Sequence, residues 1–497
     1  YTPRTLSVNT ITGENGVFRL MADVRAGTTD TISANNVNGA QYIQIYQNPS
    51  HISLDVAGKN MVVASAATLG VNGGFEGIAT IIGLYDYLPI LQQTNTAGGR
   101  INWVLAGITQ TPNQTAKSLF NILSLPYKTF RIHADNLYYR MDDLLYPPTL
   151  NGLWAKVYAG GIYQKQPSKD KTTQDLFYSF QGGYDKGENF GEKRYFYGFS
   201  LDYTRLNTGD KGYKGYVHSI DIGGYGGYLD ENGWDISGSM QYGYSYNHTQ
   251  LYQADDPFNF GGHFFLLSMR VGYRFYPFYK IKTRIIEKCV RPTFCRNGIE
   301  DLRIRDESFY FQPYVSLTPG FILGEKISFS DKQSRSHISA KLHASPALIS
   351  KIGLLTLKRY DYPNQALNLR ALIEYSHDLN LGGKITLTDD VDMPLNRSVQ
   401  MDNRLGIGIG GDYLLLNDSL KFYGDFKTEF FGKLNTYWLV SAGIRYKFGQ
   451  KPPKTYKSLN YRPQVNQTQK ARPKNVFKPY ESIPSPKSDS FYQNNHY

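Results

Sequence analysis

The stretch Tyr437-Trp-Leu-Val-Ser-Ala-Gly-Ile-Arg-Tyr-Lys-Phe448 decides the fold of this chain. Every second residue from Trp438 to Phe448 is apolar or aromatic, whereas the residues between them include Arg445 and Lys447. Side chains of a strand point alternately to opposite faces, so this strand separates an apolar medium from a polar one. It closes a long series of similar segments, and the series predicts a membrane β-barrel.

The clearest of the earlier segments is 233–248, where Trp, Ile, Met and Tyr alternate with Asp, Ser and Gln. Segments 193–205 and 419–430 repeat the pattern, with aromatic residues opposite charged ones. A soluble β-sandwich also alternates, but it rarely sets so many aromatic residues opposite charge. We therefore predict twelve strands, an even number as in bacterial barrels. They are centred on residues 152–164, 174–184, 193–205, 215–228, 233–248, 262–276, 308–322, 349–359, 366–378, 402–415, 419–430 and 437–448.

Bulk composition agrees with a barrel. The 497 residues contain no run of about 18 apolar residues, so helical membrane spans are not expected. The mean hydropathy of −0.43 suits a barrel because half of each strand is polar. The 41 tyrosines suit membrane–water interfaces. The chain starts at Tyr1 without a charged start and apolar region, so we expect a piece of a longer precursor without its signal peptide.

The net charge of +12 is concentrated at the end of the chain. Residues 449–497 carry nine Lys or Arg, two acidic residues and seven prolines, without a hydrophobic period. This composition predicts a disordered, solvated tail. The alternative is a tail that contacts an anionic cell wall or inner-leaflet headgroups. No nucleic-acid motif accompanies the charge, so nucleic acid is not expected as a partner.

The chain has two cysteines, Cys289 and Cys295, and two cysteines without nearby histidine do not complete a zinc site. We predict a local disulfide in an oxidising compartment. The cysteines lie in 277–307, an insertion between the sixth and seventh strands that parity places in the periplasm. The nine histidines form no local motif with Ser or Asp, so no enzyme, cofactor or metal is expected.

Residues 1–108 read as short strands divided by Gly and Asn turns, with examples at 5–9, 16–20, 42–46 and 101–105. Their spacing is close to one turn of a parallel β-helix, and an ordinary β-sandwich is the alternative. We expect Val17, Phe18, Leu20, Ile43 and Ile45 to be buried in this part.

Residues 109–149 change character. Pro112 can open a helix, Pro126 breaks it, and two prolines at 147–148 end it. The second helical segment carries Arg131 and Asp135, so it cannot lie in lipid. It could lie in a polar barrel lumen.

This order of parts resembles the C-terminal part of monomeric (type V) autotransporters. The match covers about residues 1–448, and four motifs carry it. Residues 16–30 resemble a passenger strand with its matched Asp, and 84–88 with 98–105 resemble the end of a pertactin-like autochaperone module. Residues 152–161 resemble the first barrel strand, and polar-x-Gly443-x-x-Tyr446-x-Phe448 resembles the outer-membrane sorting signal.

The resemblance implies an all-β fold, a twelve-stranded antiparallel transmembrane barrel with a lumen-plugging helix, preceded by a short parallel β-helix module. It implies four parts: a passenger-end module at 1–108, a linker with the lumen helix at 109–149, the barrel at 150–448 and the tail at 449–497. Unlike the family, in which the last aromatic residue ends the chain, Phe448 is followed by this tail.

The resemblance also implies a function. The chain would be an outer-membrane translocator that exports and anchors an upstream passenger, which could be an adhesin, toxin or protease. Its partners would be periplasmic chaperones, the barrel-assembly machinery, outer-membrane lipid and the passenger itself. Folding of residues 1–108 at the cell surface would make export irreversible, because it buries apolar groups. An outer-membrane channel with an N-terminal β domain is the alternative.

One motif raises a chemical question. Residues 136–144 resemble the lumen-helix motif of self-cleaving serine-protease autotransporters, in which an Asn before the matched Asn cyclises onto its own carbonyl. Here that preceding residue is Asp135, and the bond in question joins it to Asn136. Asp202, Glu374 or Asp425 could assist as a general acid or base. Otherwise Asp135 is an ordinary helix ion-pair residue, with Arg131 or Arg140 as its partner.

Overall fold

The computed structural model of the protein describes residues 1–144, 151–165, 172–190, 193–230, 232–291, 294–332, 336–390, 394–398, 400–416 and 418–448. The tail predicted at 449–497 lies outside these residues. No helix in the described part of the chain is long and apolar enough to cross a bilayer.

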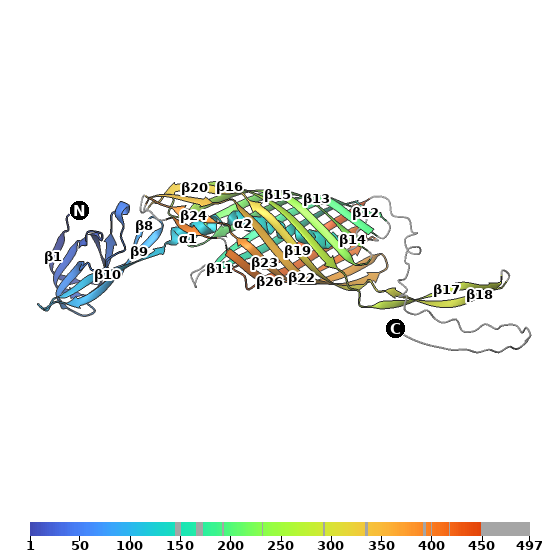
Figure 1. The fold of residues 1–497 in the computed structure, drawn as a ribbon, viewed down its shortest axis with the longest axis horizontal. Coiled ribbons are helices and arrows are strands. Elements are labelled where there is room, and N and C mark those ends of the chain that lie inside the picture. Colours follow the sequence, from blue (N-terminus) through green and yellow to red (C-terminus); the bar gives the residue numbers. More distant parts are fainter. Residues whose placement is uncertain are drawn as a thin grey trace, which may run out of the picture. The chain divides into compact units, whose positions relative to one another are not determined.

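Twelve antiparallel strands close into a barrel, and all twelve predicted strands are confirmed (Figure 1). The closure joins the first strand to the last, with Asn151 opposite Phe448. The strands are β11 (Asn151–Lys165), β12 (Thr172–Phe190), β13 (Lys193–Gly209), β14 (Tyr213–Asp230), β15 (Trp234–Leu251), β16 (Phe258–Tyr273), β19 (Phe309–Ile322), β22 (Ser345–Tyr362), β23 (Gln365–Leu381), β26 (Gln400–Leu415), β27 (Leu420–Phe430) and β28 (Leu434–Phe448).

The two faces of the barrel wall differ as the alternation predicts. In β15, Met240 is 69% exposed on the outer face and Asp235 is fully buried on the lumen side. In β28, Arg445 and Lys447 are buried in the lumen, whereas Ile444 faces outward. The wall is therefore apolar toward lipid and charged toward the lumen.

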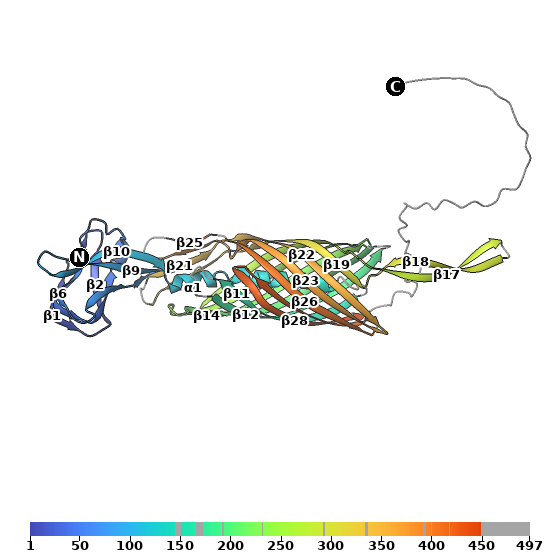
Figure 2. The same cartoon turned by 90° about the horizontal axis from the view of Figure 1, so that it is seen from below.

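Two helices precede the barrel, α1 (Gln114–Ile122) and α2 (Leu125–Leu144). Asn113 caps α1, because its side-chain oxygen accepts the amide hydrogen of Ala116 at 3.0 Å. Pro126 lies in the first turn of α2, where its missing N–H costs nothing, so the break predicted there is confirmed. Both views show α2 enclosed by barrel strands (Figures 1 and 2).

One rim of the barrel carries a small sheet that the sequence did not indicate. Its four strands, in sheet order, are β20 (Glu325–Ser330), β21 (His337–Leu342), β24 (Ile385–Thr388) and β25 (Leu395–Arg397). Their buried side chains, such as Ile338 and Leu387, belong to the same apolar cluster as Leu119 of α1. The strands are too short to have registered as membrane strands.

The predicted insertion contains a separate two-stranded sheet, β17 (Tyr279–Arg291) with β18 (Phe294–Arg305). It comes between β16 and β19, as expected. The side chains of Cys289 and Cys295 lie outside the described part, so their disulfide stays a prediction.

The N-terminal module is a short parallel β-helix. One sheet pairs β1 (Thr5–Thr12), β4 (Thr31–Asn38) and β6 (Val62–Leu69) in parallel, and a second pairs β2 (Gly16–Asp23), β5 (Ala40–Tyr46) and β7 (Gly74–Ile78) in parallel. Parallel pairing of successive turns confirms the β-helix and excludes the sandwich. The remaining elements are β3 (Thr28–Thr29), a 3-10 turn (Pro49–His51), β8 (Thr80–Ile82), β9 (Tyr85–Asn95) and β10 (Ile101–Pro112).

The expected core of this module is confirmed for Leu20, Ile43 and Ile45, which are buried, and for Phe18, which packs against them. It is wrong for Val17, which is 49% exposed. Neighbouring residues of a strand face opposite sides, so Val17 and Phe18 cannot both point inward.

Candidate functional site

The candidate site is the barrel lumen where α2 meets the wall. Five polar side chains of α2, Lys128, Thr129, Arg131, His133 and Asn136, are at most 2% exposed. Lys128 Nζ lies 2.5 Å from Asp175 on β12. Burying a charge without a partner costs several kcal/mol, so these contacts define where the helix can sit.

Arg131 connects α2 to the last two strands of the barrel. Its guanidinium pairs with Glu429 on β27 and donates to the backbone oxygen of Leu434 at 2.7 Å. Arg131 was a predicted partner of Asp135, and that prediction is wrong because the long side chain reaches the wall instead of the next helical turn. The other predicted partner, Arg140, has a side chain outside the described part.

Asp135 pairs with the barrel wall. Its Oδ1 lies 2.7 Å from Lys351 Nζ on β22, and the same ammonium group lies 3.5 Å from Glu374 on β23. Glu374 also pairs with Lys427 of β27 and accepts a hydrogen bond from the Tyr314 hydroxyl at 2.9 Å. Asp135 thus joins a network of alternating charge.

Asn136 is held at both its side chain and its backbone. Its Nδ2 donates to Asp202 Oδ2 on β13 at 2.9 Å, and its carbonyl oxygen accepts from the Tyr158 hydroxyl at 3.0 Å. Of the residues predicted to assist cleavage, Asp202 contacts Asn136 directly. Glu374 reaches Asp135 only through Lys351.

Asp425 lies elsewhere in the wall. It pairs with Lys156 of β11 at 3.0 Å and with Arg370 of β23 at 2.8 Å. Its carboxylate is occupied by these two cations, and no described contact joins it to Asp135 or Asn136. The structure therefore assembles part of the predicted set.

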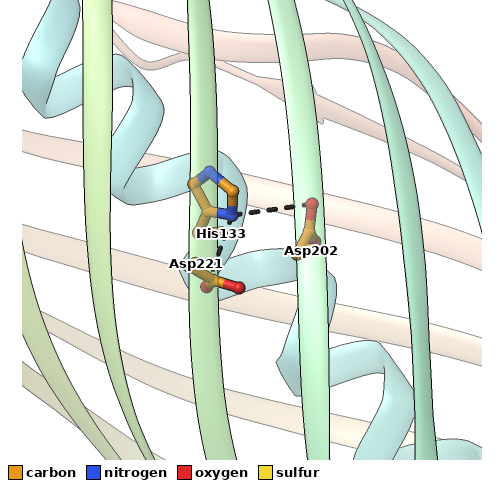
Figure 3. A group of neighbouring side chains, drawn as sticks. All are labelled: His133, Asp202 and Asp221. Atoms are coloured by element: carbon orange, nitrogen blue, oxygen red, sulfur yellow. Dashed lines mark ion pairs between the residues drawn. The ribbon is translucent and has the colours of Figure 1, made fainter.

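A second lumen cluster was missed by the sequence reasoning. His133 Nδ1 lies 3.3 Å from Asp221 Oδ2 on β14 and 3.6 Å from Asp202 Oδ1 on β13 (Figure 3). The opposite ring nitrogen, Nε2, lies 2.9 Å from the Ser219 hydroxyl. The cluster joins one helix to two strands, so no local spacing in the chain could reveal it.

The rim contacts hold α1. Asp210, in the turn between β13 and β14, accepts hydrogen bonds from Ser118 and Asn121, each at 3.0 Å. Arg397 of β25 donates to the Phe120 carbonyl at 3.2 Å and to Ser124 Oγ at 2.8 Å, near the C-terminal end of α1. Burial lowers the pKa of Arg397 to about 10, which leaves it charged at neutral pH.

The predicted sorting residues lie on the last strand with different orientations. Tyr446 is 54% and Phe448 39% exposed on the outer face. Gly443 faces the lumen, where a side-chain carbon would overlap the ring of Tyr423. Tyr446 and Phe448 are thus accessible from outside the barrel, whereas Gly443 makes room for the ring of Tyr423.

A family model described as autotransporter beta-domain matches residues 153–427. The serine protease sat autotransporter of Escherichia coli O6:H1 is 23% identical over 451 residues, which cover 89% of this chain and 31% of that protein. The serine protease SepA autotransporter of Shigella flexneri is 23% identical over 370 residues, covering 74% of this chain and 24% of that protein. The chain thus spans about a third or less of the length of these relatives.

Two solved structures are similar at low identity. The beta domain of the Bordetella autotransporter BrkA gives a TM-score of 0.44 at 16% identity, covering 60% of this chain and all of that one. The translocator domain of the autotransporter NalP from Neisseria meningitidis gives 0.42 at 15% identity, covering 65% of this chain and 98% of that one.

Proposed function

Because the chain belongs to the autotransporter beta-domain family, we propose that its barrel exports an N-terminal passenger across the outer membrane and then anchors it. The observation that carries this proposal is α2, which lies inside the closed barrel and is connected through α1 to the β-helix module. A chain that runs through its own lumen has the path that export requires.

The β-helix module would make export irreversible. Its turns stack side by side, and residues such as Ile32, Val37 and Val63 are fully buried between them. Each turn that folds outside the cell removes apolar area from water and gives about 25 cal/mol per Å². The folded module would not return through a lumen that α2 fills.

A passenger upstream of Tyr1 would define the activity of the whole protein. Relatives named serine proteases make a protease one candidate, and an adhesin or toxin is equally compatible with this translocator. Residues 1–108, 109–149, 150–448 and 449–497 would serve as passenger end, linker with plug, barrel and tail. The partners would be chaperones, the assembly machinery and, for the tail, the cell wall.

We further propose that the passenger stays attached. The Asp135 carboxylate is held beside Lys351, and its chemistry differs from the amide of the self-cleaving relatives. Cleavage after an asparagine forms a succinimide whose nitrogen comes from the side-chain amide, and this nitrogen displaces the next residue. An aspartate has no side-chain nitrogen, and its carboxylate could displace the next residue only by closing a cyclic anhydride. The chain would then display its passenger as an anchored surface protein.

The deciding experiment uses the precursor with an epitope tag upstream of Tyr1, expressed in cells. Exposure of the tag on intact cells supports export through this barrel. A tag confined to the periplasm refutes export and favours the channel alternative. The two are separated further by conductance in planar bilayers, where the plugged translocator should pass little current and an open channel a large one.

A further inference from the structure

Asp202 and Asp221 differ from the other acidic residues of the lumen in the cation they face. Most lumen carboxylates pair with Lys or Arg; examples are Asp175, Asp185, Glu374, Asp402, Asp412, Asp425 and Glu429. Within the described part of the chain, the only side chain at ion-pair distance from Asp202 or Asp221 is His133. Two buried carboxylates therefore share a single imidazole.

The hydrogen bonds around His133 assign its proton. The Ser219 hydroxyl donates its hydrogen to the Tyr244 carbonyl at 3.1 Å, so its oxygen is left to accept from His133 Nε2. In its neutral form the ring then carries its proton on Nε2 and turns the Nδ1 lone pair toward two carboxylates. Among the described residues, neither Nδ1 nor Asp221 Oδ1 has a hydrogen-bond partner, although both atoms are buried. Three facing lone pairs repel one another unless a cation lies between them.

We propose that His133, Asp202 and Asp221 bind a divalent transition-metal ion, with Zn²⁺ as the best match. Imidazole and carboxylate together suit this class of metal. Two donor atoms about 2.1 Å from a tetrahedral metal lie roughly 3.4 Å apart. The separations of 3.3 Å and 3.6 Å from Nδ1 to the two carboxylates agree with that value, and all three donors lie within 4.8 Å of one another.

The surroundings resemble the outer layer of a metal site. Nε2 is fixed by Ser219, as metal-binding imidazoles usually are on their far side. Asn136 donates to Asp202 Oδ2 at 2.9 Å and Thr204 donates to Oδ1 at 3.2 Å, so that carboxylate is oriented. The ring of His133 also lies 5.3 Å from that of Phe264, which excludes water on one side.

The ion would fasten the plug. His133 belongs to α2, whereas Asp202 and Asp221 belong to β13 and β14. One bound metal would cross-link the helix to two adjacent wall strands, and it would be acquired when the helix settles in the lumen. Metal binding and plug seating would then stabilise each other.

The test uses the full chain without a polyhistidine tag, folded in detergent, stripped with a chelator and passed through a desalting column. Zn²⁺ is added, excess is removed, and bound metal is measured by mass spectrometry. Co²⁺ is added to a second sample to record the visible absorption of a tetrahedral site. We expect about one metal per chain.

Two variants remove the site and two serve as matched controls. His133→Gln and Asp221→Asn should each lower bound metal at least tenfold. His263→Gln changes a half-buried histidine that meets Tyr242, and Asp235→Asn changes a buried lumen carboxylate that meets Gln312. Both controls should keep the metal.

Folding of every variant is checked by its migration on gels before and after heating. A folded wild type that retains no more Zn²⁺ than folded His133→Gln overturns the proposal, and a proton then holds the cluster together. If folded His133→Gln loses the metal that the wild type keeps, the metal site is supported by this variant alone. The test therefore stays decisive even if Asp221→Asn misfolds.

Discussion

Lys351 of the barrel wall and Asp135 of the lumen helix form an ion pair with Nζ and Oδ1 2.7 Å apart. Asp135 also supplies the carbonyl group of the peptide bond to Asn136. The same ammonium group lies 3.5 Å from Glu374, so the Asp135 side chain is held by a lysine that is itself anchored to the wall. This arrangement favours an intact helix.

The first prediction concerns that bond. The wild-type precursor should run as a single uncut band, and Asp135→Asn should yield a shorter chain that begins at Asn136, because the new amide supplies the nitrogen for a succinimide. Band sizes and N-terminal sequencing measure the outcome. Asp135→Ala is the control, since it removes the carboxylate without adding an amide. Cutting of the wild type that Asp135→Ala abolishes would show that the aspartate itself is reactive.

The second prediction concerns Arg131. Arg131→Met leaves Glu429 without its main partner, and removing one member of a buried pair costs about 3–5 kcal/mol. We expect the lower end, because Lys427 Nζ remains 3.4 Å from Glu429. The midpoint of denaturant unfolding in detergent measures this. The double variant Arg131→Met/Glu429→Gln should recover part of the loss, and equal destabilisation of the single and double variants would contradict the explanation.

The third prediction uses the N-terminal module. Burial acts to raise the pKa of Asp30, but hydrogen bonds from the Tyr1 hydroxyl and from the Met21 and Arg4 amides outweigh it and lower the pKa below 3.8. A lowered pKa stabilises the fold above the unfolded value, and that contribution disappears as pH falls through the folded value.

Asp30→Asn should therefore weaken the module at pH 7 and have a smaller effect near pH 3. Limited proteolysis of the full chain at both pH values measures this, with an acid-stable protease at low pH. Asp55→Asn in an exposed loop is the control. A loss of protection that is the same at both pH values would rule out the carboxylate as its source.

The fourth prediction concerns the seat of the plug. A side chain at Gly320 would overlap the ring of Phe130, which is fully buried on α2. Gly320→Val should destabilise the plugged state by about 1–3 kcal/mol and raise single-barrel conductance, because the helix must shift. Gly224→Val is the control, since a carbon there meets only the Gly198 oxygen at 4.0 Å. Unchanged conductance in folded Gly320→Val would show that the barrel wall shifts to accommodate the valine and that α2 keeps its position.

The fifth prediction concerns recognition of the last strand. Phe448→Ser should lower the amount of barrel in the outer membrane several-fold while leaving the unfolding midpoint of the assembled fraction nearly unchanged. Phe422→Ser removes an equally outward aromatic residue of β27 and should assemble normally. Western blots of membrane fractions compare the two. Equal losses in both variants would mean that lipid contact, and not recognition of the end, explains the effect.

Strand alternation was enough to predict the barrel, because each membrane strand must be apolar outward and polar inward. The strand that contains Met240 and Asp235 shows why: the apolar Met240 must face lipid, and the charged Asp235 must face the polar lumen. The rim strands at 325–330 and 385–388 lacked this constraint, since they pack on α1 in a mixed environment. The sequence alone therefore could not distinguish these rim strands from loops.

The lumen was harder to predict than the wall. Charges on residues 125–144 indicated a polar surrounding, but the partners of Asp135 and Arg131 come from strands more than 200 residues away. The pairing depends on strand register and on the rotation of the helix, neither of which a single sequence fixes. The same reason hid the cluster of His133 with Asp221.

The wall contacts of α2 imply an order of events. Partners such as Asp175 and Glu429 lie on different strands, and residues 125–144 reach them only as a helix with a rise of about 1.5 Å per residue. An extended chain in transit rises about 3.3 Å per residue and passes these partners out of register. The charged side chains of the wall therefore find their partners only after residues 125–144 have stopped moving through the lumen and have formed α2. The ion pairs of α2 would therefore form only once export has ended, so their presence distinguishes a barrel that has finished export from one that is still exporting.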